Sequence, residues 1–183
     1  MTHKLIFLDI DGVMNSEVSW LRYQNYGTFS ENAVNSLNSI LSRTGAKIVI
    51  SSSWREIHPY KEMEAILCDQ GVHAHGRVIG QTPSWNKTSK GNILCGFKCR
   101  GDEIHNWLEN YDGKVEGIVL LDDTMDMVHM YPWLVLTNAY VGLTKADADL
   151  AVSILDQPFD IRLADSFKTT FANDSSEGCL QDA

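Results

Sequence analysis

Short apolar runs alternate along the chain with stretches in which apolar residues recur at helical spacing. The runs cover residues 5–8, 46–51, 115–121 and 133–137. Several apolar residues in succession, without regular alternation with polar ones, are typical of strands buried on both faces, as in a parallel sheet. We therefore predict a buried strand at each of these positions.

Helical patterns occupy most of the intervals between these strands. Val34, Leu37 and Leu41 recur every three or four residues, between a candidate N-cap at Ser30 and a closing glycine at Gly45. Similar patterns predict helices from Pro59 to Gly71, over 101–111, over 125–131 and from Thr144 to Leu155. Two stretches lack this pattern: we expect an irregular aromatic loop over 14–29, and short strands with a long loop over 72–100.

Strands that alternate with helices predict a three-layer, Rossmann-like α/β fold with a mainly parallel sheet. Right-handed crossovers would place the ends of strands 5–8, 46–51 and 115–121 side by side. The length of 183 residues, 44% of them hydrophobic, fits one compact domain. We assign residues 1–164 to this domain and residues 165–183 to a flexible C-terminal tail.

Acidic residues follow two of the predicted strands. Asp9 and Asp11 end the first, and Asp122 and Asp123 follow the third. Alternate residues of a strand project to the same side, and open α/β sheets bind ligands at the carboxyl ends of their strands. Neighbouring carboxylates repel each other unless a cation lies between them. The pattern therefore predicts a divalent-metal site with one carboxylate free to act as a nucleophile. For the first pair alone, the alternative is a turn with two solvated aspartates.

The charge distribution bears on possible substrates. The net charge of −9 argues by itself against a nucleic-acid-binding protein. However, residues 1–100 carry a net charge of +3 and residues 101–183 a net charge of −12. The stretch 70–100 lacks acidic residues and contains Arg77, Lys87, Lys90, Lys98 and Arg100. This stretch either guides a phosphorylated substrate to the site or is a solvated basic loop.

The remaining composition favours a cytoplasmic protein without membrane contact. No apolar run approaches the roughly 18–20 residues of a membrane span, and the N-terminus lacks a signal-peptide pattern. Four cysteines do not make a disulfide framework, and Cys95 and Cys99 lack the second pair of a typical zinc site, so we expect reduced thiols. The histidines show no convincing ligand spacing, and we assign them no role.

Taken in order, these motifs resemble the haloacid dehalogenase (HAD) superfamily of phosphohydrolases. The superfamily has a DxDG motif after its first strand, a serine or threonine after the next core strand, a basic residue before a helix, and an acidic pair after another strand. The matching residues are Asp9 to Gly12, the run Ser51 to Ser53, Arg100 with Lys98 as the alternative, and Asp122 with Asp123. The resemblance covers about residues 4–155.

Finer details resemble one branch of the superfamily. The segments KIVISSSWR, VIGQTP, RGDEIHNWL, LLDDTMD and VLTNAYVGLT are similar to the HAD domain of RNA-repair (Swiss Army Knife) proteins. They are more distantly similar to polynucleotide 3′-phosphatase domains. The resemblance implies a Mg²⁺-dependent phosphatase with an aspartyl-phosphate intermediate. A partner enzyme would supply any further repair step, because the chain lacks a nucleotide-binding P-loop.

The resemblance also implies a role for each matching residue. Asp9 would be the nucleophile and Asp11 the general acid and base. Mg²⁺ would be bound by Asp9, the backbone carbonyl of Asp11 and Asp122, and Asp123 would bind it through water or orient its neighbour. A further set would contact the phosphoryl group: Ser52 or Ser51 as hydrogen-bond donor, Arg100 or Lys98 as the cation, and Ser53 and Arg55 beside them.

The motif spacing suggests an open site. About 40 residues separate Asp11 from Ser52 and about 47 separate Ser52 from Arg100, and neither interval has room for a large cap domain. An open site favours a bulky substrate such as a nucleic-acid end or a phosphoprotein, with residues 70–100 as its rim. Trp54 and Trp85 are candidates for base stacking. Alternatively, loop 14–29 closes over a nucleotide. Two other functions stay open: a phosphatase for a small metabolite or phosphoprotein, and a catalytically idle HAD-fold binding protein.

Overall fold

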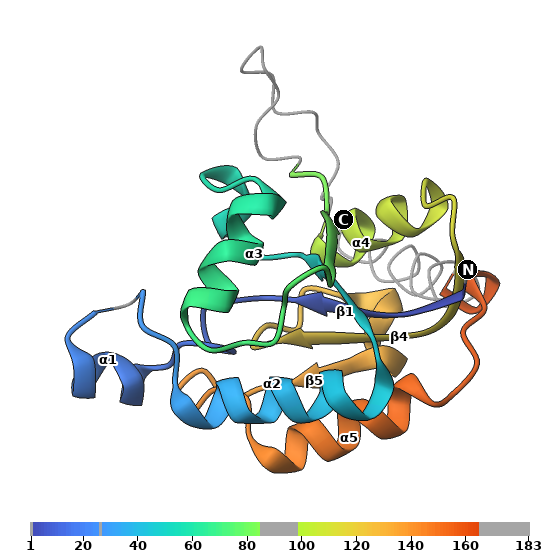
Figure 1. The fold of residues 1–183 in the computed structure, drawn as a ribbon. Helices are drawn as coiled ribbons and strands as arrows, with labels where there is room; N and C mark the ends of the chain where they lie inside the picture. Colours follow the sequence, from blue (N-terminus) through green and yellow to red (C-terminus); the bar gives the residue numbers. More distant parts are fainter. Residues whose placement is uncertain (1, 26, 85–98, 165–183) are drawn as a thin grey trace, which may run out of the picture.

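A single parallel sheet organises the molecule (Figure 1). The computed structural model describes residues 2–25, 27–84 and 99–164. Within these residues, five strands pair in the order β3-β2-β1-β4-β5, and every pairing is parallel. Their bounds are Thr2–Leu8 (β1), Lys47–Ile50 (β2), Val78–Gln81 (β3), Lys114–Asp122 (β4) and Leu134–Leu136 (β5). The predicted α/β fold is confirmed, and strands β2 and β4 flank β1 as expected.

Alternation along β1 divides the core between the two faces of the sheet. Leu5 and Phe7 belong to one buried cluster, whereas Ile6 and Leu8 belong to the other. All four side chains are fully buried. Because both faces of the strand are covered, its sequence reads as an uninterrupted apolar run.

Helices α2 (Glu31–Thr44), α3 (Tyr60–Asp69) and α5 (Lys145–Leu155) cover the face of Ile6 and Leu8. Ser30 caps α2 and Gly45 ends it with a φ of +66°, both as predicted. Thr144 caps α5 through a capping box with Asp147. Figure 1 shows α2 and α5 side by side along the sheet.

Helix α4 (Arg100–Glu109) and the 3₁₀ helix η2 (Val128–Trp133) cover the opposite face. Trp107 of α4 stacks on Tyr111 and meets the ring of Phe7 edge-on. The short helix predicted over 125–131 is present as a 3₁₀ helix that begins three residues later and ends two residues later. Pro132 lacks the N–H that a longer α-helix through this segment would use.

The expected irregular loop over 14–29 contains a helix, α1 (Glu17–Tyr23). Ser16 caps it, and the side chain of Ser19 accepts a hydrogen bond from the backbone amide of Ser16. The apolar pattern misses this helix because Ser19 is its one buried residue within the described part of α1. In Figure 1, α1 lies at the end of the sheet where β1 finishes.

Two sequence predictions lie beyond what the structure tests. The predicted tail at 165–183, and residues 85–98 of the stretch 72–100 in which a long loop was predicted, fall outside the described residues. None of the helices in the described ranges has the length and apolarity that a membrane crossing requires.

Candidate active site

Three acidic side chains meet where β1 and β4 end. The amide of Asp9 donates to the carbonyl of Leu121 at 3.0 Å, which sets the end of β1 against Asp122. Carboxylate oxygens of Asp9, Asp122 and Asp123 lie within 4.8 Å of one another. Asp9 and Asp122 are buried and Asp123 is half-buried. The predicted convergence of acids from two strands is therefore present in the structure.

Arg100, the first residue of α4, lies against two of these acids. Its Nη1 atom is 2.7 Å from Asp9 Oδ2 and 2.7 Å from Asp122 Oδ2. Burial acts to lower the pKa of Arg100, but the carboxylates of Asp9 and Asp122 outweigh that effect and hold its pKa above the ordinary value. The guanidinium is therefore a permanent positive charge beside the acidic cluster.

Burial and mutual repulsion disfavour the charged forms of Asp122 and Asp123 even though Arg100 lies beside the cluster. Burial raises the pKa of Asp122, and the charge of Asp9 raises it further, against the opposing effects of Arg100 and of the hydrogen bonds from Thr124. The pKa of Asp123 is also raised, first by burial and then by Asp9. Three carboxylates facing one guanidinium leave an excess of negative charge, which favours binding of a further cation.

The donor set fits Mg²⁺. Hard divalent cations prefer oxygen ligands, and Asp9, Asp122 and Asp123 offer only carboxylate oxygens. One oxygen of Asp9 accepts the Ile10 amide at 2.8 Å, and Asp122 Oδ1 accepts from the backbone and hydroxyl of Thr124 at 2.9 and 2.7 Å. These bonds fix the orientation of two candidate ligands before any metal binds.

Asp11 differs from the other three acids. It is exposed, and its carboxylate accepts hydrogen bonds from Trp54 Nε1 at 3.0 Å and from Asn15 Nδ2 at 2.8 Å. Of the two predicted acidic pairs, Asp9, Asp122 and Asp123 bring their carboxylates together, and the carboxylate of Asp11 lies outside that group. The sequence analysis missed Asn15, which lies four residues after Asp11; that spacing was the available signal.

The turn after β1 brings Gly12 and Asp123 close together. Gly12 has a φ of +73°, and a Cβ atom there would lie 2.2 Å from Asp123 Oδ2. The carbonyl of Gly12 accepts a hydrogen bond from Thr137 Oγ1 at 2.9 Å, and the amide of Thr137 donates to the carbonyl of Asp122. The glycine thus permits both the turn and the approach of Asp123.

The serine run follows β2, next to β1. Ser51 and Ser52 are buried, and the amide of Ser51 donates to the carbonyl of Leu8 at 3.0 Å. Ser52 caps the short 3₁₀ helix η1 (Ser53–Glu56) by accepting the amide of Trp54, whereas Ser53 is exposed. The structure thus brings the run to the edge that carries Asp9, and the choice between Ser51 and Ser52 stays a prediction.

Arg55 is turned into the protein. Its guanidinium pairs with Glu103 at 2.5 Å, and both side chains are buried. It also donates to the carbonyls of Ser51 and Ser52 at 2.5 and 2.6 Å. Burial lowers the pKa of Arg55 and Glu103 opposes this effect. These contacts favour a supporting role for Arg55, and a direct contact with substrate stays a prediction.

The proposed basic rim is only partly described. Lys87, Lys90, Lys98 and Trp85 lie outside the described residues. Arg77 precedes β3 and donates to the carbonyl of Ala46, which places it at the amino edge of the parallel sheet, away from the acids. Among the described residues of the predicted rim, Arg100 therefore lies at the site and Arg77 does not.

A parallel sheet with an acidic pair after adjacent strands and a basic residue against it is the arrangement of HAD-type hydrolases, a class that includes phosphatases. Residues 5–148 match the family model described as the HAD domain in Swiss Army Knife RNA repair proteins. Since this match covers most of the chain, the protein belongs to that family.

A similar solved structure is the HAD domain of the effector protein Lem4 from Legionella pneumophila. It is 16% identical in sequence, with a TM-score of 0.46, and the comparison covers 82% of this chain and 98% of that one. No curated protein is significantly similar in sequence to this chain.

Proposed function

We propose that the protein is a Mg²⁺-dependent phosphatase that works through an aspartyl phosphate on Asp9. The observation that carries the proposal is the position of Asp9, whose carboxylate is held by the Ile10 amide and by Arg100, next to Asp122 and Asp123. A carboxylate fixed in this way is oriented for nucleophilic attack.

In the first step, a carboxylate oxygen of Asp9 attacks phosphorus and the bond from phosphorus to the leaving oxygen breaks. Asp11, in its protonated form, gives its proton to that oxygen, and the product alcohol leaves. Trp54 and Asn15 hold the Asp11 carboxyl group apart from the acidic cluster, where it is exposed to an incoming leaving group.

In the second step, Asp11 takes a proton from water, and the resulting hydroxide attacks the phosphorus of the aspartyl phosphate. The bond between phosphorus and Asp9 breaks, which releases phosphate and restores both carboxyl groups to their starting states. The same residue thus acts as acid and then as base.

Charge on the phosphoryl group is balanced from several sides. Arg100, with Lys98 as the alternative, faces the phosphoryl oxygens, and the hydroxyl of Ser52 or Ser51 donates to one of them, with Ser53 at the rim. Such fixed donors and charges account for most catalysis of phosphoryl transfer. Mg²⁺ held by Asp9, Asp122, Asp123 and the Asp11 carbonyl would supply further neutralisation of the phosphoryl oxygens.

The proposed substrate is a phosphorylated nucleic-acid end or nucleotide. A pocket of about 520 Å³ lies directly beside Asp11, within the size range of small-molecule sites. Trp54 and Asn15 line it, and the indole offers a surface on which a base stacks. The family's occurrence in RNA repair proteins supports the same substrate class. A partner enzyme would perform any subsequent sealing step.

A substrate panel tests this proposal. We expect faster Mg²⁺-dependent phosphate release from a 3′- or 5′-phosphorylated oligonucleotide than from small phosphorylated metabolites or a phosphotyrosine peptide. Asp9→Asn should abolish release from every substrate. Equal or faster hydrolysis of metabolites or phosphopeptide would refute the nucleic-acid assignment, whereas no hydrolysis of any substrate would favour an idle binding protein.

A further inference from the structure

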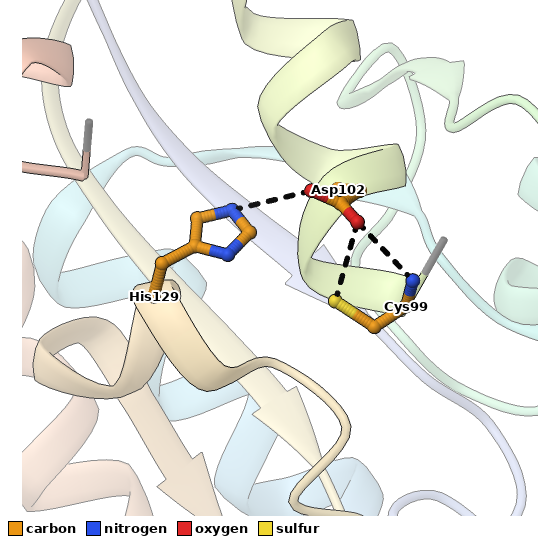
Figure 2. Close-up of side chains that lie close together, drawn as sticks. All are labelled: Cys99, Asp102 and His129. Carbon is orange, nitrogen blue, oxygen red and sulfur yellow. Dashed lines mark hydrogen bonds and ion pairs between the residues drawn. The ribbon is translucent and has the colours of Figure 1, made fainter. Parts of the chain in front are cut away.

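A second group of metal-ligating side chains lies beside Arg100, outside the acidic cluster. Cys99 immediately precedes α4, Asp102 is in the first turn of α4, and His129 is in η2 (Figure 2). Figure 2 shows the Cys99 thiol and the His129 imidazole directed at the Asp102 carboxylate from two different elements. The sequence analysis missed this group, because 27 to 30 positions separate its two halves and no motif connects them.

The distances within this group approach those of a tetrahedral metal site. Cys99 Sγ lies 3.6 Å from Asp102 Oδ2, and His129 Nε2 lies 4.0 Å from Asp102 Oδ1. One potential ligand atom from each of the three residues falls within 4.8 Å of the others. Ligands around Zn²⁺ are about 3.3–3.6 Å apart, given the usual Zn–S, Zn–N and Zn–O bond lengths. Shifts of a few tenths of an ångström to about one ångström would close the site.

The backbone holds the two halves of this group together. A Cβ atom on Gly101 would lie 2.8 Å from the carbonyl oxygen of Met127, so the start of α4 packs directly on the segment before His129. The amide of Gly101 donates to the carbonyl of Asp126 at 3.2 Å, and the amide of Arg100 donates to the Asp126 carboxylate at 3.2 Å. This contact prepositions the three side chains, which reduces the entropy that metal binding must overcome.

Two of the three side chains are accessible to an ion from solvent. His129 is buried with 3% exposure against the edge of the His105 ring, whereas Cys99 and Asp102 are half-buried and accessible from solvent. Burial raises the pKa of the Cys99 thiol, and the carboxylates of Asp102 and Asp126 add to this effect against the backbone hydrogen bonds. A metal that binds here displaces the thiol proton to solvent.

We propose that Cys99, Asp102 and His129 form a second metal site for Zn²⁺ or a similar borderline divalent ion. Sulfur, imidazole nitrogen and one carboxylate form a ligand set typical of zinc and unlike the oxygen-only cluster of Asp9, Asp122 and Asp123. Three protein ligands leave a fourth position for water. Because Cys99 adjoins Arg100, the bound ion would fix the start of α4 and thus the guanidinium that contacts Asp9.

Cobalt substitution tests this site directly. The metal-stripped 183-residue chain is titrated with Co²⁺ in excess Mg²⁺, and the thiolate-to-cobalt charge-transfer absorption is recorded. We expect a band that saturates at one equivalent of Co²⁺, disappears in Cys99→Ala, and needs at least about tenfold more Co²⁺ in His129→Gln. Zn²⁺ should displace the Co²⁺ and raise the melting temperature of the same protein.

The matched control is Cys68→Ala, which removes a half-buried free cysteine of α3 and should leave the band unchanged. Circular dichroism of each variant shows whether it is folded. If Cys99→Ala or His129→Gln fails to fold, the cobalt titration of the other variant tests the site. A band that survives Cys99→Ala, or the absence of any band in the wild type, would show a hydrogen-bonded helix cap only and would overturn the proposal. Neither result bears on phosphatase activity at Asp9, so the two proposals fail separately.

Discussion

At the scale of single residues, the separation of Asp11 from the other acids agrees with the different roles proposed for Asp9 and Asp11. Asp9 is held inside the cluster by Arg100, whereas Asp11 is held outside it by Trp54 and Asn15. A carboxylate among other carboxylates and a cation is suited to attack and metal binding. A carboxyl group exposed beside a pocket is suited to exchange protons with a leaving group and with water.

Replacing Asp11 tests that division. In Asp11→Asn, we expect turnover of an alkyl phosphate such as a phosphorylated oligonucleotide to fall by about 10²–10⁴, because the leaving oxygen loses its proton donor. The loss should be much smaller for p-nitrophenyl phosphate, whose leaving group departs without a proton. Single-turnover rates on both substrates give the comparison, and equal losses on the two would contradict the role of Asp11 as general acid.

The glycine after Asp11 allows a second test with an internal control. Gly12 and Gly45 both have a positive φ, +73° and +66°, so alanine at either costs roughly 1–2 kcal/mol of backbone strain. A Cβ on Gly12 would meet Asp123, whereas a Cβ on Gly45 would meet nothing within 4 Å.

We therefore expect Gly12→Ala to lower phosphatase activity at least about tenfold and to weaken Mg²⁺ binding. Gly45→Ala should keep both properties and lose only stability. Activity assays and Mg²⁺ titrations of the two purified variants provide the measurement. If both variants keep full activity, the close approach of Gly12 to Asp123 is not needed for function.

The sequence predicted the acids and Arg100 because short motifs carry them. It did not predict how Asp11 is held, since Trp54 is 43 positions away and its indole reaches Asp11 only in the folded chain. The same limit applies to Arg55, which the sequence suggested as a substrate contact before its partner Glu103 was known.

At the scale of secondary-structure elements, the buried pair of Arg55 and Glu103 connects η1 to α4. The two elements carry the serine run and Arg100, so this connection helps to set their relative position. Removal of one partner from a buried ion pair typically costs about 3–5 kcal/mol, because the remaining charge is left without compensation.

We expect Arg55→Met and Glu103→Met each to reduce the free energy of unfolding by about that amount, and the double variant to lose less than the sum. Chemical denaturation of the four proteins completes the cycle. If Arg55 instead serves mainly to bind substrate, Arg55→Met would fold with normal stability and show a raised KM.

The sequence predicted the position and type of elements that have a strong apolar pattern. It did not predict the elements that lack such a pattern. Strand β1 and helices α2 and α5 follow from buried runs and caps. Helix α1 was missed because its apolar residues Val18 and Leu21 are exposed, so burial leaves no periodic signal. The segment over 125–131 kept a helical pattern, but Pro132 limited it to a 3₁₀ helix.

At the scale of the whole molecule, metal binding and folding should be coupled through pH. The raised pKa of Asp122 and Asp123 means that the folded, metal-free protein binds more protons than the unfolded chain. Asp122 and Asp123 therefore contribute their full stabilisation below about pH 4, the carboxyl pKa in the unfolded chain. This stabilisation is lost as the pH rises through the higher pKa values of the two groups in the folded protein.

Mg²⁺ binds the deprotonated carboxylates, so its stabilising effect should grow as pH rises through the same window. Near saturation, at about 100 times the dissociation constant, we expect it to add about 2.7 kcal/mol to the unfolding free energy. Thermal melts with Mg²⁺ or EDTA at several pH values measure the effect. In Asp122→Asn it should be small at every pH, and an undiminished effect in that variant would place the ion elsewhere.

The order of strands and helices in the sequence was enough to predict the fold. The same pattern did not predict the substrate. The Asp11 pocket is lined by residues from three separate segments, near positions 11–17, 54 and 139, so its size and chemistry emerge only when the chain folds.

The central claim is that Asp9 receives the phosphoryl group. Acid quenching of the wild-type enzyme during turnover with Mg²⁺ and a phosphorylated oligonucleotide or p-nitrophenyl phosphate, followed by peptide mass spectrometry, tests it directly. We expect an added phosphoryl mass on the peptide that contains Asp9, and none in Asp9→Asn. A phosphoryl group found on another residue, or steady turnover by Asp9→Asn, would contradict it.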